Sequence, residues 1–192
     1  MQSDLNSKIS PIKAEETQRK FLTIEEAKSL YKTDCSLPVL KQAALFSIFT
    51  GLRFSDIKKM TWGEIEFIAG NGYFIHFRQE KTEDFEVMPI PEQAFALLGE
   101  RKEPTTKVFQ DLSYSDWTNR ILAKWLNNAG ITKDVTFHSF RHTYATLQLS
   151  KGTSLFTVSK MLGHRDIKTT QIYAKIIDQT KREATNKIML GL

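Results

Sequence analysis

Two of the chain's four histidines lie together with an arginine in one short stretch, residues 138–146 (HSFRHTYAT). In a helix, His138, Arg141 and His142 are spaced at i, i+3 and i+4, so their side chains project from one face. Imidazole and guanidinium groups together are typical of a site that binds an anion or moves protons, because both donate hydrogen bonds and histidine titrates near neutral pH. A face that is buried only for packing would not carry them.

Two other stretches combine the same residue types with a tyrosine. Residues 50–57 (TGLRFSDI) contain Arg53, and residues 162–175 (LGHRDIKTTQIYAK) contain His164 and Tyr173. A phosphodiester attacked by an oxygen nucleophile gains negative charge on its non-bridging oxygens, which guanidinium forks bind two at a time. A phenol becomes a better nucleophile beside such cations, because they favour its ionised form. These residue types are those that phosphoryl transfer uses, with a tyrosine as a candidate nucleophile.

The order and spacing of these motifs resemble those of the tyrosine recombinase (phage integrase) family. The resemblance extends over about residues 21–188 and includes a hairpin lysine, which corresponds to Lys81 in residues 79–90 (QEKTEDFEVMPI). It implies that Tyr173 attacks DNA, becomes joined to a 3′ phosphate and frees a 5′ hydroxyl, while Lys81 protonates the leaving oxygen. The catalytic residues that it implies are Arg53, Lys81, His138, Arg141, His164 and Tyr173.

Two more residues of these motifs are expected to support the catalytic set. Asp56 stands where the family usually has glutamate, and we expect its carboxylate to hold Arg53 in place. His142 is expected to brace the helix from the same side as His138 rather than to carry a proton.

Rival assignments remain for the nucleophile and for the lysine. Tyr144 lies one turn from Arg141, although its helical spacing is typical of a packing ridge. Any exposed lysine, such as Lys102 or Lys107, would resemble Lys81, because hairpin position is hard to fix from sequence. The QxKT context and the family pattern favour Lys81.

The resemblance also implies the partners. The chain is expected to bind double-stranded DNA and to form a homo-tetramer on two DNA sites. Accessory DNA-bending proteins are compatible with this assembly. No metal or other cofactor is implied, and the sequence offers neither an HExxH motif nor a cysteine cluster, since Cys35 is the single cysteine. The amphipathic tail, about residues 174–192, is expected to contact a neighbouring protomer.

Composition fits this interpretation. The chain of 192 residues has a net charge of +5 and a pI near 9.2, which favours polyanionic partners. No apolar run approaches the ~18 residues that a membrane span needs. The polar amino-terminal stretch lacks the apolar centre of a signal peptide. We expect a cytoplasmic, nucleoid-associated bacterial protein.

Apolar periodicity predicts an α+β fold, mostly helical, with one small antiparallel three-stranded sheet between residues 64 and 90. Thr23 and Glu26 form a capping-box pattern at the first helix, and the second helix runs from Pro38 to Gly51. Further helices are expected at about 91–99, 114–129, 138–151, 154–162 and 166–188. The three tryptophans, Trp62, Trp117 and Trp125, are expected in the core.

The chain divides into two expected parts. Residues 1–20 lack apolar periodicity and are expected to be a linker or flexible arm, and residues 21–192 a catalytic domain that ends in the tail helix. The resemblance implies a separate amino-terminal DNA-binding domain, which we expect to be absent from this chain. The expected function is that of a site-specific recombinase (integrase) of a mobile genetic element.

Four alternatives share part of this pattern. A chromosome-resolution recombinase has the same six residues. A type IB topoisomerase shares the nucleophile, although the LGH histidine and its short spacing to Tyr173 argue against it. A DNA-binding module without catalysis would not need all six residues. A metal-dependent nuclease or transposase would need a carboxylate cluster, which the sequence does not show.

Overall fold

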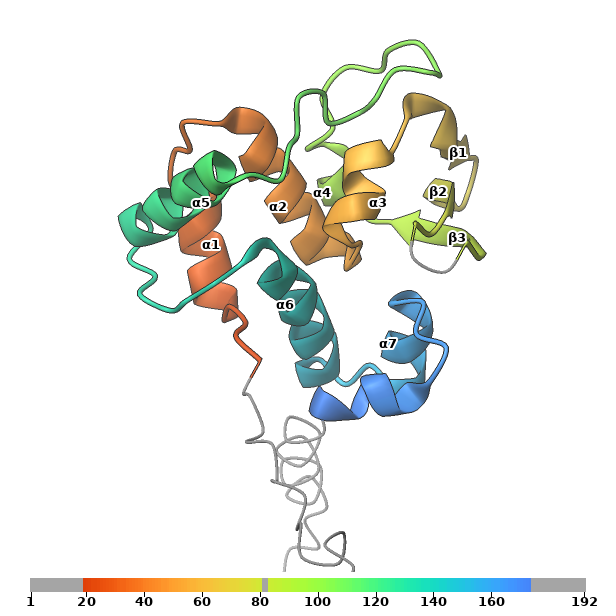
Figure 1. Ribbon diagram of the computed structural model, residues 1–192. Helices are drawn as coiled ribbons and strands as arrows, with labels where there is room; N and C mark the ends of the chain where they lie inside the picture. Colours follow the sequence, from red (N-terminus) through yellow and green to blue (C-terminus); the bar gives the residue numbers. More distant parts are fainter. Residues whose placement is uncertain (1–18, 81–82, 174–192) are drawn as a thin grey trace, which may run out of the picture.

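The computed structural model describes residues 19–80 and 83–173, which form a mostly helical α+β fold with one small sheet, as predicted (Figure 1). The helices are α1 (Ile24–Lys32), α2 (Pro38–Thr50), α3 (Phe54–Lys59), α4 (Glu92–Phe95), α5 (Asp116–Asn128), α6 (Phe137–Ser150) and α7 (Leu155–Met161). The 3₁₀ turns are η2 (Trp62–Glu64), η3 (Ile167–Thr169) and η4 (Gln171–Tyr173), and the strands are β1 (Ile65–Ile68), β2 (Gly72–Arg78) and β3 (Phe85–Ile90). No helix in the described ranges is long and apolar enough to cross a membrane.

The starts of the first two helices confirm the sequence signals. At α1, Thr23 Oγ1 accepts from Glu26 N at 3.2 Å, and Glu26 Oε2 accepts from Thr23 N at 2.7 Å. Helix α2 begins at Pro38 and ends at Thr50, and the residue that caps it, Gly51, has a left-handed φ of +70°. This residue turns the chain sharply, so that Arg53 follows at the start of α3.

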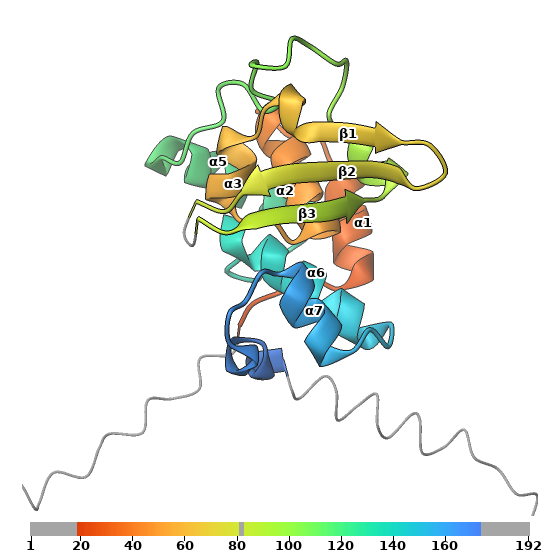
Figure 2. The same cartoon turned by 90° about the vertical axis from the view of Figure 1, so that its right-hand side faces the viewer.

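The sheet is antiparallel in the order β1-β2-β3. Ile65 of β1 pairs with Ile75 of β2, which pairs with Met88 of β3, and all three side chains are buried. Figure 2 shows the strands face on, with α6 and α7 below them. The far end of β2 comes close to α3, because the backbone N–H of Glu80 donates to the Asp56 carboxylate at 2.9 Å. The end of β2 therefore brings Glu80 to the helix that follows Arg53.

Helix α6 packs against α2 and α7 and crosses the middle of the molecule (Figure 1). Its aromatic side chain Phe140 is fully buried in the main core, which also contains Trp62 and Trp125 as predicted. The prediction for Trp117 was wrong, since this side chain is 55% exposed. Trp117 is the second residue of α5, one position before Thr118, and the buried stripe of this amphipathic helix passes through Thr118, not Trp117.

A second, smaller apolar cluster lies between α6 and the end of the described chain. It contains Tyr144, Ala145 and Leu149 of α6, Val158 of α7, and then Leu162 and Tyr173. Because Tyr173 belongs to this cluster, packing against α6 fixes where its side chain lies.

Two predicted helices differ from the structure. The segment predicted as a helix over 91–99 contains only the four-residue α4, because it lies between Pro91 and Gly99 and Gly99 adopts a left-handed φ of +77°. The helix predicted from 166 is instead the two 3₁₀ turns η3 and η4 as far as Tyr173. Asp166 caps the first turn with its side chain, which accepts from Lys168 N at 2.9 Å and favours a tight turn. The remainder of that prediction lies outside the described residues.

Candidate active site

Arg53 is held at the start of α3 by two side chains. Its Nη1 donates to Gln79 Oε1 at 2.6 Å and lies 3.7 Å from Asp56 Oδ2. Asp56 is almost fully buried, and its other oxygen accepts from the backbone of Glu80. Because the backbone fixes this carboxylate, Asp56 orients the guanidinium group of Arg53.

Arg141 is fixed by two backbone carbonyls instead of a carboxylate. The side chain is buried, and its Nη1 donates to Gly51 O at 2.6 Å and its Nη2 to Leu162 O at 2.5 Å. These carbonyls follow the ends of α2 and α7, where backbone groups lack partners within the helix. Burial, and then repulsion from Arg53, lower the pKa of Arg141 to about 9, so the group stays charged at neutral pH.

The two arginines line one cavity of about 260 Å³, which is also lined by Gln79, Glu86 and Lys160. We call this cavity the arginine hollow. Two guanidinium groups that face one small cavity from separate elements can bind different oxygens of a single phosphate. The arginine hollow is therefore the candidate phosphate site.

The histidines of the two motifs lie beside this charge. His164 Nδ1 lies 2.8 Å from Thr170 Oγ1. Burial, and then the positive charges of Arg141, Arg53 and His138, lower the pKa of His164 to about 4. His138 is exposed on α6, with its ring centroid 4.6 Å from that of His142.

Tyr173 is buried, and its hydroxyl oxygen lies 2.5 Å from His142 Nδ1. Burial raises the pKa of Tyr173 to about 12, although the charge of Arg141 acts in the opposite direction. The phenol is therefore protonated at neutral pH. Sequence reasoning gave His142 a bracing role, whereas the structure brings its ring nitrogen onto the oxygen of the candidate nucleophile.

The rival tyrosine, Tyr144, has a different environment. Its hydroxyl donates to Met161 Sδ at 3.6 Å, and its ring packs in the α6–α7 cluster. Burial raises the pKa of Tyr144 to about 12. Its location agrees with the packing ridge that its helical spacing predicts.

Gln79 is a site residue that sequence reasoning missed. It is buried, binds Arg53 through Oε1 and donates through Nε2 to Glu86 Oε1 at 3.2 Å. It also fills the space above Gly163, where an added Cβ would lie 1.8 Å from Gln79 Nε2. A sequence signal existed, because Gln79 continues the inward-facing alternation of Ile75 and Phe77.

Two expected features lie outside the described residues. Lys81 follows Glu80 at the end of the described first range, and the tail at 174–192 follows Tyr173. Within the described ranges, no three His, Cys, Asp or Glu side chains form a group that could hold a metal ion.

The buried histidine His142 makes stability depend on pH. Burial, and then the charges of His138, Arg19, Arg141 and His164, lower the pKa of His142 from 6.5 to about 4. Between these two values the unfolded chain binds a proton that the folded chain does not. The contribution to stability is complete above about pH 6.5 and is lost as the pH falls towards 4. From about pH 7 to about pH 5, His142 alone should lower the free energy of unfolding by roughly 1–2 kcal/mol.

Urea unfolding at several pH values measures this effect. The variant His142→Asn should reduce the loss of stability on acidification, whereas His76→Asn, on the sheet, keeps both His142 and His164 and should retain that loss. Equal slopes for the unaltered chain and His142→Asn would contradict the prediction.

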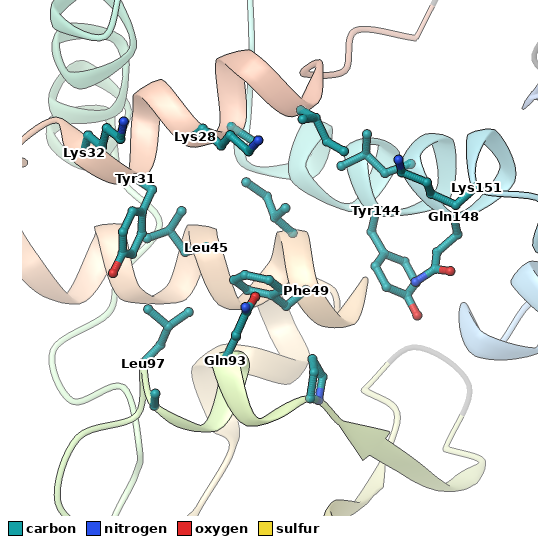
Figure 3. A pocket seen from close by; sticks show the side chains of 16 residues that line it. Lys28, Tyr31, Lys32, Leu45, Phe49, Gln93, Leu97, Tyr144, Gln148 and Lys151 are labelled. Carbon is teal, nitrogen blue, oxygen red and sulfur yellow. The ribbon is translucent and has the colours of Figure 1, made fainter.

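A larger hollow lies away from this site (Figure 3). This groove, of about 750 Å³, runs between α1, α2, α4 and α6, with apolar side chains such as Leu45, Phe49 and Leu97 and with lysines such as Lys28 and Lys151. Apart from the rival Tyr144, none of the residues proposed for chemistry lines it. The groove is larger than the arginine hollow, but the two arginines that can bind a phosphate line the arginine hollow, so we take the smaller cavity as the candidate active site.

The fold and the site together define a class of protein, in which a mostly helical α+β domain places two anchored arginines and histidines beside a buried tyrosine. Residues 20–180 match the sequence model of the phage integrase family. The chain belongs to the phage integrase family.

Similar proteins agree with this assignment. A tyrosine recombinase of Thermosipho africanus is 30% identical over 176 residues, which cover 88% of this chain and 61% of that protein. The XerH recombinase bound to its difH DNA superposes with a TM-score of 0.67 at 20% identity, covering 88% of this chain and 53% of XerH. The catalytic domain of bacteriophage HP1 integrase superposes with a TM-score of 0.64 at 20% identity, covering 86% of this chain and 93% of that domain. The chain spans about half to two thirds of the length of the curated relatives that it matches.

Proposed function

We propose that this chain is the catalytic part of a site-specific DNA recombinase, which cuts and rejoins duplex DNA through a covalent 3′-phosphotyrosine. The observation that carries the proposal is the arginine hollow, where Arg53 and Arg141 are both fixed in place before any DNA arrives. Preorganised donors of this kind stabilise the charge that develops on a phosphate under attack. Family membership supports the same chemistry.

Each proposed residue has one role in the cleavage step. Arg53 and Arg141 bind the non-bridging oxygens, and His138 and His164 complete the cage as hydrogen-bond donors. Tyr173 forms a bond from its phenol oxygen to phosphorus, and the bond from phosphorus to the 5′ oxygen breaks. Lys81 gives a proton to that leaving oxygen.

Rejoining is the reverse of this step. A 5′ hydroxyl attacks the phosphotyrosine and releases Tyr173, so the bond energy is retained and neither ATP nor a metal ion is consumed. Integration of a mobile element and resolution of chromosomes both begin with this cleavage, and the proposal covers the chemistry of both.

The proposed partner is duplex DNA. XerH, a structural neighbour, is bound to DNA in its crystal structure, and the net charge of this chain favours phosphate contacts. Residues 21–192 are proposed as the catalytic domain, working in a homo-tetramer on two DNA sites. Contact of the tail at 174–192 with a neighbouring protomer belongs to the same proposal.

The test is covalent capture on nicked suicide DNA. The substrate is a pool of nicked duplexes with a randomised sequence around the nick, so that the short fragment diffuses away and an adduct accumulates. A protein–DNA adduct that survives a chelator and denaturing electrophoresis is expected from the unaltered chain. Tyr173→Phe should form none, because the new bond needs the phenol oxygen.

The matched control is Tyr144→Phe, which removes the rival hydroxyl and its contact with Met161. This variant should still form the adduct. An adduct that persists in Tyr173→Phe, or one that disappears with the chelator, would contradict the proposal.

A further inference from the structure

His142 of α6 contacts the hydroxyl oxygen of Tyr173, which is the reacting atom of the proposed nucleophile. Its side chain is 8% exposed, and its Nδ1 lies 2.5 Å from the hydroxyl oxygen of Tyr173, a residue 31 positions later in the chain. The neighbouring residue Arg141 points its guanidinium group to Gly51 and Leu162 instead. Of these two adjacent residues of α6, Arg141 therefore lines the proposed phosphate site and His142 contacts the proposed nucleophile.

The protonation states decide what this contact can do. Burial raises the pKa of Tyr173 to about 12, so its hydroxyl keeps a proton at neutral pH. Burial and nearby cations lower the pKa of His142 to about 4, so the imidazole is neutral and has one nitrogen free to accept. Attack on phosphorus requires that the phenol lose its proton as the new bond forms. His142 Nδ1 is already at hydrogen-bond distance from the oxygen that carries this proton.

We propose that His142 accepts the proton of Tyr173 during strand cleavage, through the hydrogen bond between Nδ1 and the phenol oxygen. The inference rests on the function proposed above. As the bond from the Tyr173 oxygen to phosphorus forms, the phenol proton moves to Nδ1, while the 5′ oxygen leaves with a proton from Lys81. In rejoining, the imidazolium returns its proton to the departing Tyr173, and the attacking 5′ hydroxyl gives its proton to Lys81.

The surroundings of His142 connect its basicity to DNA binding. Tyr173 of η4 and His138 of α6 contact His142, and the charges of His138, Arg19, Arg141 and His164 act on it. The cations among them oppose protonation of His142. A phosphodiester bound in the arginine hollow adds negative charge beside these cations and offsets their effect. His142 therefore becomes a stronger base when the scissile phosphate is in place.

Two suicide substrates separate this role from the others. One is the nicked duplex pool described above, and the other carries sulfur in place of the bridging 5′ oxygen, because a thiolate leaves without being protonated. Loss of the general acid, as in Lys81→Ala, should be rescued by the sulfur substrate. Loss of the proton acceptor should not be rescued, since the phenol must still lose its proton.

The informative variant is His142→Asn, whose side-chain oxygen can accept the phenol hydrogen bond but cannot take up the proton. We expect adduct formation to slow about 10²-fold on both substrates. The acid limb of the rate against pH, where His142 becomes protonated, should also disappear. His76→Asn is the matched control and should keep the rate of the unaltered chain, and circular dichroism with His142→Gln as a second variant checks that the fold is intact.

Several outcomes would overturn the inference. An unaltered rate of adduct formation in His142→Asn would mean that His142 takes no part in cleavage. A faster rate would mean that its hydrogen bond restrains Tyr173. Rescue by the sulfur substrate would place its action on the leaving group. If the unaltered chain forms no adduct, the proposed function fails and this inference fails with it, whereas an active chain with an equally active His142→Asn overturns the inference alone.

Discussion

Replacing Arg141 with lysine is expected to slow covalent capture of DNA by about 10²- to 10³-fold while the chain stays folded. The guanidinium group binds Gly51 O through one nitrogen and Leu162 O through the other, and this pair of contacts fixes the face that the group turns to the arginine hollow. Lysine keeps the positive charge, but its single ammonium group cannot reproduce the planar fork. One backbone carbonyl would also lose its partner, which costs roughly 1–3 kcal/mol of stability.

The measurements are single-turnover adduct formation on the nicked duplex pool and urea unfolding of the same preparations. Arg120→Lys makes the same chemical change at an exposed position of α5 and should leave both quantities unaltered. A rate for Arg141→Lys within a few-fold of the unaltered chain would mean that charge alone, without the anchored fork, is sufficient.

Replacing Gly51 with alanine is expected to destabilise the fold by about 3 kcal/mol or more. Gly51 has a left-handed φ of +70°, which costs an alanine roughly 1–2 kcal/mol. In addition, the new Cβ would lie 2.4 Å from Tyr144 Cδ1 and 2.9 Å from Leu162 Cδ2. Neither neighbour can move freely, because both are buried in the cluster that holds Tyr173. The strain therefore reaches the nucleophile and the carbonyl that anchors Arg141.

Gly130→Ala is the matched control for this prediction. Gly130 also has a left-handed φ, +77°, but no atom lies within 4 Å of an added Cβ. Its substitution should cost only the backbone term of roughly 1–2 kcal/mol, and the difference between the two variants isolates the cost of crowding. Equal losses of unfolding free energy in the two variants would show that Tyr144 and Leu162 make room for the added Cβ without cost.

Local sequence patterns were sufficient to predict much of the fold. The capping box at Thr23, the proline at the start of α2 and the glycine at its end act within a few residues, so their effects could be read directly. Trp117 shows the limit of such patterns, because an aromatic residue at the start of a helix lies inside or outside according to the face that the helix turns to the core.

By itself, the sequence determined the motifs and which residues share a helix face, because the helical repeat fixes the positions of residues three and four apart. Tertiary structure alone decided that Arg141 is anchored by Gly51, 90 positions away, and that His142 meets Tyr173, 31 positions away. It also brought Gln79 onto Arg53 across 26 positions. Contacts between such distant residues depend on how helices and sheet pack, and local spacing contains no information about that packing.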